Sequence, residues 1–262
     1  NKVFASRFDS RRDTVTVQND LTLGKDHLLT IGADYKHDHL SSSTEFAKSS
    51  RVNWGAFAQH QAKVYNHDVQ LSIRYDDNEQ FGGHVTGGVA WGYSFSKLFR
   101  LKAGFGTAFR SPTFNDLYFP NFGNEELNPE KSLSYEFGAS GRTSWANWSV
   151  NFFETYIDDL IEGRPDGNTF FFKAFNVEKA RIRGFEGEFK TQIKGVYINA
   201  NLTLLDPKNR SRNNLDTPSP NRGNVLPRRA EQSFRIDANK QFDRFTFGGI
   251  PFGKFSLGAV LL

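Results

Sequence analysis

The sequence predicts an all-β fold, an antiparallel up-and-down transmembrane β-barrel, and three observations support this prediction. Apolar and polar residues alternate with a period of two along most of the chain. The alternating segments number about thirteen and each runs for about ten residues, the length that crosses a bilayer at a tilt. The connections between them are alternately short and long, as in outer-membrane barrels.

The alternation is clearest over residues 99–110. Phenylalanine, leucine, alanine and threonine occupy the odd positions, whereas arginine, lysine, glycine and alanine occupy the even positions. Successive side chains of a strand point to opposite faces, so this segment has one apolar face and one polar, basic face. The same pattern recurs over residues 84–95, 132–139 and 196–204.

The lengths of the connections predict the orientation of the barrel. The long polar connections include residues 36–50, 110–131 and 206–227, and the short ones include 24–27, 96–98 and 194–195. Outer-membrane barrels have long external loops and short periplasmic turns. We therefore expect residues 36–50, 110–131 and 206–227 to face the outside of the cell.

The composition narrows the class of protein. Aromatic residues make up 15% of the chain, including 27 Phe, which suits a lipid-facing surface with aromatic girdles. The absence of cysteine excludes disulfides, thiolate metal sites and thiol nucleophiles. The net charge is only +4, and no basic helix or zinc finger is present, which argues against nucleic-acid binding. The strict alternation also fits a soluble β-sandwich, but soluble strands average only about 5–6 residues.

One stretch of the chain resembles a known family. The segment Gly106–Gly138, GTAFRSPTFNDLYFPNFGNEELNPEKSLSYEFG, resembles the signature region of TonB-dependent outer-membrane receptors. The segments Asn176–Phe189 (NVEKARIRGFEGEF) and Leu226–Phe234 (LPRRAEQSF) match further elements in the same order. Within the family, Asp76–His84 (DDNEQFGGH) and the motif KARIRGFE look most like the cobalamin transporters, although siderophore and haem receptors share most of these elements.

The resemblance implies that residues 1–262 are an incomplete β-barrel domain. Full receptors of this class have about 22 strands around a plugged lumen, and the plug domain is absent from this sequence. The implied function is high-affinity capture of a nutrient, namely cobalamin or alternatively a ferric siderophore or haem, and its import across the outer membrane of a Gram-negative bacterium. The implied partners are the TonB energy-transducing complex, reached through the plug, and outer-membrane lipid and lipopolysaccharide.

The candidate ligand-binding residues lie in the loop of the signature segment: Tyr118, Phe119, Asn121 and Phe122. Aromatic side chains on an exposed loop can grip a large, flat ligand, and the asparagine suits a tight turn. The alternative is that these aromatic side chains pack the loop against its neighbours.

The candidate lumen-facing residues are basic: Arg100, Lys102, Arg110, Arg181 and Arg183. Lumen charge tunes selectivity, and a basic wall favours anions. The resemblance implies that such residues contact the plug rather than the ligand.

No catalytic or metal site is predicted. Neighbouring residues on a strand point to opposite faces, so the pairs Asp76–Asp77 and Asp158–Asp159 are poor acid–base dyads. These loop-end carboxylates could hold calcium, since it takes oxygen ligands. The motif His37–His39 (HDH) is better explained as part of a solvated loop than as a chelate. A passive porin-like channel and a soluble all-β binding module are the alternatives to a transporter, and an enzyme is not expected.

Overall fold

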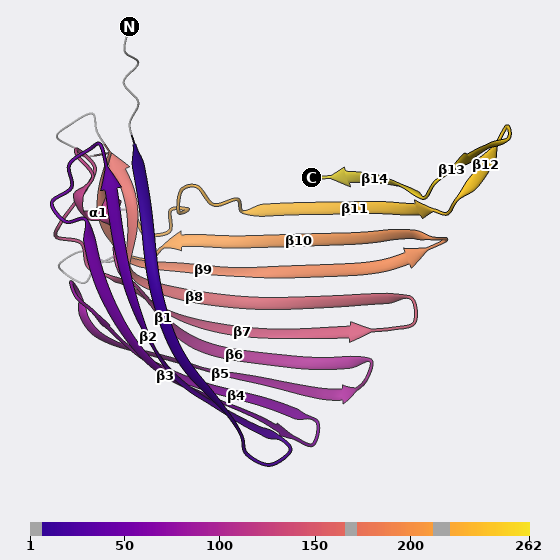
Figure 1. The fold of residues 1–262 in the computed structure, drawn as a ribbon, viewed down its shortest axis with the longest axis horizontal. Helices are drawn as coiled ribbons and strands as arrows, with labels where there is room; N and C mark the ends of the chain where they lie inside the picture. Colours follow the sequence, from indigo (N-terminus) through magenta and orange to yellow (C-terminus); the bar gives the residue numbers. More distant parts are fainter. Residues whose placement is uncertain (1–6, 166–171, 212–220) are drawn as a thin grey trace, which may run out of the picture.

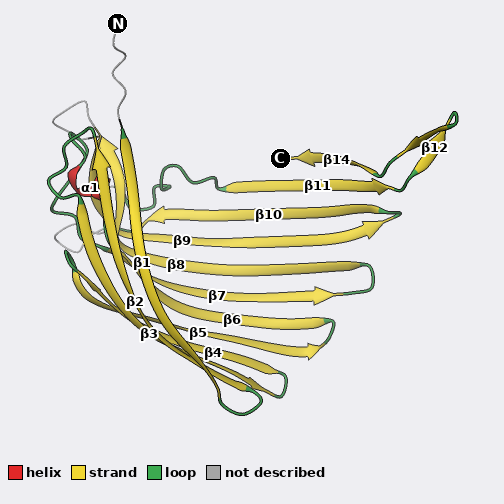
Figure 2. Cartoon of the chain, viewed as in Figure 1, coloured by secondary structure: helices red, strands yellow, loops and turns green. Residues whose placement is uncertain are grey.

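The computed structural model describes residues 7–165, 172–211 and 221–262. Strands make up most of this part of the chain, and its one helix is short (Figure 2). The elements are β1 (Phe8–Thr22), β2 (His27–Ser42), β3 (Ser50–Val64), β4 (His67–Asn78), β5 (Gly82–Ser96), β6 (Phe99–Arg110), α1 (Phe114–Tyr118), β7 (Glu130–Arg142), β8 (Ala146–Pro165), β9 (Phe172–Ile193), β10 (Val196–Asn209), β11 (Gln232–Phe242), β12 (Phe245–Phe247), β13 (Ile250–Phe252) and β14 (Phe255–Leu261).

The described strands form an antiparallel up-and-down sheet, as predicted. Twelve of them are hydrogen-bonded in the order β1 to β11 and then β14, and β12 pairs separately with β13. Most strands pair with the next along the chain, because short turns return the chain directly to its neighbour. The sheet is strongly curved. The short turns lie at one end of the strands, and the loops around α1 lie at the other end (Figure 1).

The two faces of the sheet have different chemistry. Large apolar side chains are exposed on one face, for example Val17 at 71%, Val85 at 65% and Phe137 at 53%. The other face carries polar side chains, and one hollow on it is lined by residues from β1 as far as β8. A hollow lined from strands so far apart requires that the polar face is the concave one. The convex face is therefore the apolar face, as the alternation predicts.

Aromatic rings gather on the convex face near the short turns. The ring centroids of Tyr93 and Phe95 are 4.6 Å apart, those of Phe95 and Phe99 5.4 Å, and those of Phe99 and Trp148 6.2 Å. Such a belt is typical of the interfacial girdle of a barrel, where amphipathic rings lie at the level of the lipid headgroups.

The strands run further toward the loops than the sequence pattern indicates. Residues 36–42 continue β2, and residues 158–165 continue β8, although both segments look like loops in the sequence. The connection between β4 and β5 is only residues 79–81. In the described residues, no helix is long and apolar enough to cross a bilayer.

Candidate functional site

The loop between β6 and β7, residues 111–129, is anchored to distant parts of the sheet. The Arg51 guanidinium, on the concave face of β3, donates a hydrogen bond of 2.8 Å from Nη1 to the Pro112 carbonyl. The Gln80 amide donates one of 2.7 Å to the Tyr118 hydroxyl. On β9, the Ala174 amide donates to the Phe122 carbonyl at 2.8 Å. We call this segment the cap loop, because its anchor on Arg51 draws it over the concave face.

A small apolar core lies beneath the cap loop. Leu117 and Leu127 are buried to 3% and 4% exposure, and they pack with Ala174, which is fully buried. Phe81 and Ile161 pack against this cluster from two other elements. The cap loop is thus held by hydrophobic burial in water as well as by hydrogen bonds.

The signature residues of the cap loop have local structural roles. A Cβ on Gly123 would lie 2.5 Å from the Leu117 carbonyl oxygen, so only glycine fits there. The Asn124 side chain donates to the Ala174 carbonyl at 3.1 Å and accepts from the Glu126 amide at 3.1 Å. Thr113 caps α1 in a capping box with Asp116. The signature therefore specifies the conformation of an ordered loop.

A salt bridge closes the base of the cap loop. The guanidinium of Arg110, the last residue of β6, meets the Glu130 carboxylate in a bidentate pair, with Nε–Oε2 at 2.8 Å and Nη2–Oε1 at 2.5 Å. The same carboxylate accepts the Ile161 amide at 2.8 Å. The Glu of the signature thus ties β6, β7 and β8 together where the cap loop begins and ends.

The four candidate ligand residues divide into two pairs. Tyr118 and Phe122 are half-buried against the core of the cap loop, which favours the packing alternative for them. Phe119 is 42% exposed, and Asn121 is exposed with a φ of +62°. The Phe119 ring lies 6.1 Å from that of Phe46, in the loop between β2 and β3. Phe119 and Asn121 are therefore the candidates free to meet a ligand.

The concave wall is crossed by ion pairs that pass over glycines. The Arg74 guanidinium of β4 binds both Asp34 oxygens, at 2.7 and 3.1 Å, and also Asp76, at 2.6 and 2.7 Å. It lies over Gly55 of β3, where any Cβ would overlap it. Lys36 adds a contact of 3.2 Å to Asp34. The absence of a side chain at Gly55 lets one arginine bridge β2 and β4.

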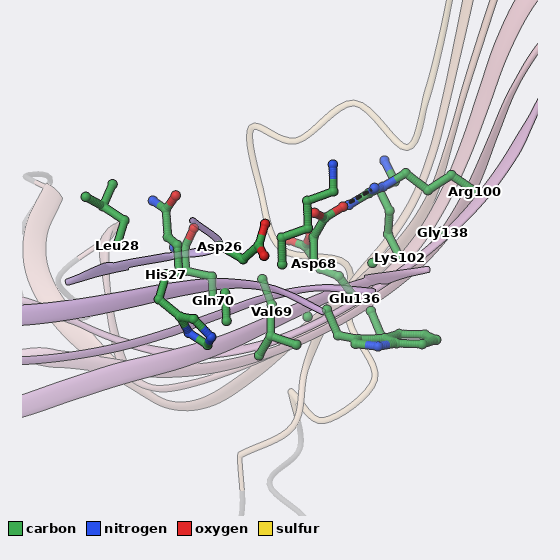
Figure 3. Close-up of a pocket in the computed structure, with 18 of the residues that line it drawn as sticks. Asp26, His27, Leu28, Asp68, Val69, Gln70, Arg100, Lys102, Glu136 and Gly138 are labelled. Carbon is green, nitrogen blue, oxygen red and sulfur yellow. Dashed lines mark hydrogen bonds and ion pairs between the residues drawn. The ribbon is translucent and has the colours of Figure 1, made fainter. Parts of the chain in front are cut away.

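Arg100 repeats this arrangement further along the sheet. Its guanidinium, from β6, crosses Gly92 of β5 to pair with Asp68 of β4, and it donates to Ser94 at 3.1 Å. Figure 3 shows Asp68 and Arg100 on one side of the strands, with His27 and Val69 on the other. These residues border a hollow of about 680 Å³.

Lys102 and Glu136 also line this hollow, in line with their places on the concave face. Arg100, Lys102 and Arg110 thus lie on the concave face, as the alternation predicts, but carboxylates already pair with two of them.

Arg181 and Arg183 lie on the convex face, so the prediction that they face the lumen is wrong. Arg183 is directly opposite Glu154 and Asp206, and the next pair along the same face is Phe185 with Phe152. Cross-strand partners share a face of the sheet, and residues two apart on a strand do so as well. The apolar residue between these arginines, Ile182, instead packs inward on the cluster of Leu160, Val177, Ala180 and Leu226.

The paired carboxylates and histidines do not converge. Asp76 is held by Arg74, whereas the neighbouring Asp77 points to the other face. In HDH, Asp38 pairs with Arg12 at 2.5 Å, and both histidines lie on the opposite face from it. Among the described residues, no three His, Cys, Asp or Glu side chains gather in a way that could hold a metal ion.

Several residues of the site escape the sequence reasoning. Arg51, Arg74 and Asp34 organise the concave wall and the cap loop, yet no sequence pattern singles them out. The sequence pattern that could reveal them is a glycine on the polar face of one strand, flanked across the sheet by an arginine on one neighbouring strand and an acidic residue on the other. That signal needs the register of three strands, which the alternation alone does not fix.

Comparison with known families identifies a matching domain. A family model described as TonB dependent receptor-like, beta-barrel matches residues 3–260. A protein named vitamin B12 transporter BtuB, from Photobacterium profundum, is 29% identical over 212 residues, which are 78% of this chain and 34% of that protein. A protein of the same name from Vibrio vulnificus is 27% identical, over 92% of this chain and 38% of its own length. The chain thus spans about a third of these relatives.

Solved structures show the same fold at lower identity. The siderophore receptor PirA from Acinetobacter baumannii is 17% identical with a TM-score of 0.68, and the match covers 99% of this chain and 49% of that one. A structure described as the copper transporter OprC is 17% identical with a TM-score of 0.69, over 97% of this chain and 48% of that one.

Proposed function

The chain belongs to the TonB-dependent receptor β-barrel family, and from this premise we propose that it forms part of the wall and external loops of an outer-membrane receptor that imports cobalamin. The family is one of receptors and transporters, so the proposed activity is binding and passage rather than catalysis. Energy would come from the TonB complex through a plug. The relatives named vitamin B12 transporters support cobalamin as the ligand.

The single observation that carries the proposal is the fixed cap loop with Phe119 on its surface. A loop that is already ordered loses little conformational entropy on binding, which favours tight capture of a scarce ligand. Exposed Phe119, edge-on to Phe46, offers flat apolar area of the kind that a large ring system can cover.

The direct test is equilibrium binding of cyanocobalamin to the complete protein in detergent, with a ferric siderophore as the competing ligand, in the presence and absence of calcium. We expect Phe119→Ala to weaken cyanocobalamin binding by about tenfold, since an aromatic contact contributes about 0.5–1.5 kcal/mol beyond its buried area. Tyr65→Ala is the matched control, because Tyr65 is 92% exposed at the opposite end of the sheet. Equal affinities of both variants and the native protein would remove Phe119 from the site.

A ferric siderophore is the second candidate ligand. A hollow of about 740 Å³ between β8 and the segment 221–229 is bordered by Arg164, Arg228 and Arg229. One carboxylate, Glu162, contacts two of these arginines, at 3.8 and 3.2 Å, so positive charge is in excess there. This excess favours an anionic ligand. Binding of the ferric siderophore alone would select this candidate, and binding of neither ligand would favour a passive channel.

A further inference from the structure

Two histidine rings meet on the convex face of the sheet, near the short turns. His27 is the first residue of β2, and His60 lies near the end of β3. His27 is directly opposite Ala62, and His60 is directly opposite Leu29, so the two histidines are diagonal neighbours on one face. The small side chain of Ala62 beside His27 leaves room for the His60 ring.

The two rings have the geometry of two ligands of one metal ion. His27 Nδ1 and His60 Nε2 are 3.2 Å apart. The ring centroids are 5.3 Å apart and the ring planes differ by only 5°, so the two nitrogens face each other between nearly coplanar rings. An imidazole nitrogen binds a metal such as Zn²⁺ at about 2.0–2.1 Å. With bonds of that length, a nitrogen separation of 3.2 Å corresponds to an angle of about 100–105° at the metal, between the square-planar and tetrahedral values.

The chemistry of the pair selects a transition metal. Neutral imidazoles suit Cu²⁺, Zn²⁺ and Ni²⁺, whereas Ca²⁺ and Mg²⁺ prefer oxygen ligands. A hydrogen bond between the facing nitrogens of His27 and His60 needs one of them to carry a proton. The second nitrogen of the same ring can carry this proton instead, so both facing nitrogens can bind a metal ion without release of a proton. Among the described residues, no third His, Cys, Asp or Glu side chain joins the pair.

The pair lies at the level of the aromatic girdle. His27 belongs to one cross-strand row of the convex face with Val69 and Trp91. Trp91 is two residues from Tyr93, whose ring is part of the aromatic belt near the short turns. Such a belt lies at the headgroups of a bilayer, where water is present. His27 is exposed, so a metal ion bound there keeps water on its remaining coordination positions.

We propose that His27 and His60 form a two-histidine site for a divalent transition-metal ion, with Cu²⁺ bound most tightly of the first-row series. The site joins two strands where the chain does not. β2 and β3 are connected by residues 43–49 at the loop end, whereas at the turn end β2 connects to β1 and β3 connects to β4. A metal ion held by both rings links β2 to β3 at this open end. It therefore stabilises the pairing of the two strands from the outer surface of the sheet, away from the lumen.

The test is a titration of Cu²⁺ into the complete protein in detergent, without an affinity tag. Electron paramagnetic resonance counts the bound ions and the imidazole nitrogens around them. The test variants are His27→Gln and His60→Gln, each of which removes one ligand and keeps a polar side chain. The matched control is His39→Gln, because His39 is an exposed histidine on the same face of β2 at its loop end.

The native protein is expected to bind one more equivalent of Cu²⁺ than either test variant, and the spectrum of this ion should show two imidazole nitrogens. The His39→Gln control should bind as many equivalents as the native protein, and Mg²⁺ should not compete for the site. An equal number of bound Cu²⁺ ions in His60→Gln and the native protein would overturn the inference, as would a loss in only one of the two test variants.

Unfolding by urea provides a second readout on the same samples. When free Cu²⁺ is at a hundred times the dissociation constant of the site, the unfolding equilibrium constant of the native protein should fall about a hundredfold. His39→Gln should show the same response and the test variants should not, while heat-modified mobility on gels confirms that each variant is folded. An equal response of the native protein and the test variants would overturn the inference. Neither readout involves an imported nutrient, so the outcome is independent of the proposed function.

Discussion

Replacing Leu127 by alanine should release the cap loop from the barrel without unfolding the barrel itself. Leu127 is 4% exposed and packs on Leu117 and Ala174, which belong to α1 and β9. The sheet is held by its own hydrogen-bonded strand pairs, none of which includes Leu127. The substitution should therefore weaken the docking of the cap loop on the sheet and leave the stability of the sheet itself unchanged.

The size of the effect follows from the burial. A buried Leu→Ala substitution costs about 2–5 kcal/mol, depending on how far the surroundings collapse into the cavity. An external loop can collapse more easily than the interior of a domain, so we expect about 2–3 kcal/mol. At about 1.4 kcal/mol per factor of ten, the population with an undocked loop rises roughly 30- to 150-fold.

Hydrogen exchange measures this population directly. The Ala174 amide, which donates to the Phe122 carbonyl of the cap loop, is exposed to water only when the loop undocks. Its exchange should accelerate by the factor above, whereas amides within the β4–β5 ladder should keep their rates. Glu125→Ala, at an exposed position of the same loop, is the control and should change neither. Unchanged protection of Ala174 in Leu127→Ala would refute the idea that burial of Leu127 holds the loop.

Two further substitutions test the faces of the sheet. Gly55→Ala should displace the Arg74 guanidinium and lower barrel stability by about 1–3 kcal/mol through the lost hydrogen bonds. Gly104→Ala is the control and should be tolerated, because its Cβ would meet no heavy atom closer than 3.7 Å. Urea unfolding in lipid vesicles measures both stabilities, and equal values would contradict the stabilising role of the Arg74 bridge over Gly55. Leu71→Arg, on the convex face, should cost about 2–4 kcal/mol in the same assay. Gln70→Arg, on the concave face, should cost little, and the reverse order would mean that the faces are assigned wrongly.

The fold follows from the sequence to a large extent because barrel strands obey a local rule. Each strand shows a period of two, and short turns force consecutive strands to pair. The ends of the strands were less predictable. Residues 158–165 look polar and loop-like, yet they continue β8 because β9 pairs with them throughout. Outside the bilayer, a strand is stabilised by hydrogen bonds to its neighbouring strands and needs no apolar face. The composition of the sequence therefore does not show where such a strand ends.

The misplacement of Arg181 and Arg183 has a similar cause. Ala180 and Ile182 resemble the apolar positions of a lipid-facing strand, which would turn the arginines inward. Ala180 and Ile182 are instead covered from the concave side by a loop residue, Leu226. The apolar face of β9 therefore changes sides along the strand, and Phe185, which is paired with Phe152 on the convex face, indicates the correct phase.

The candidate site was predictable in part. The resemblance pointed to the cap loop, and local turn chemistry accounts for Asn121 and Gly123. The difference in exposure between Phe119 and Phe122 is not predictable from the sequence. It depends on the packing of Phe122 against Ala174, which is about fifty residues away along the chain. Long-range contacts of this kind decide which aromatic residues of a loop are free to bind.

The most direct test of the account is the affinity of the complete protein for cyanocobalamin, measured against a ferric siderophore in detergent. The account predicts tight, saturable binding of cyanocobalamin that Phe119→Ala weakens and Tyr65→Ala does not. Tight binding of the siderophore alone would contradict the proposed ligand, and binding of neither would contradict the proposed role of the cap loop in nutrient capture.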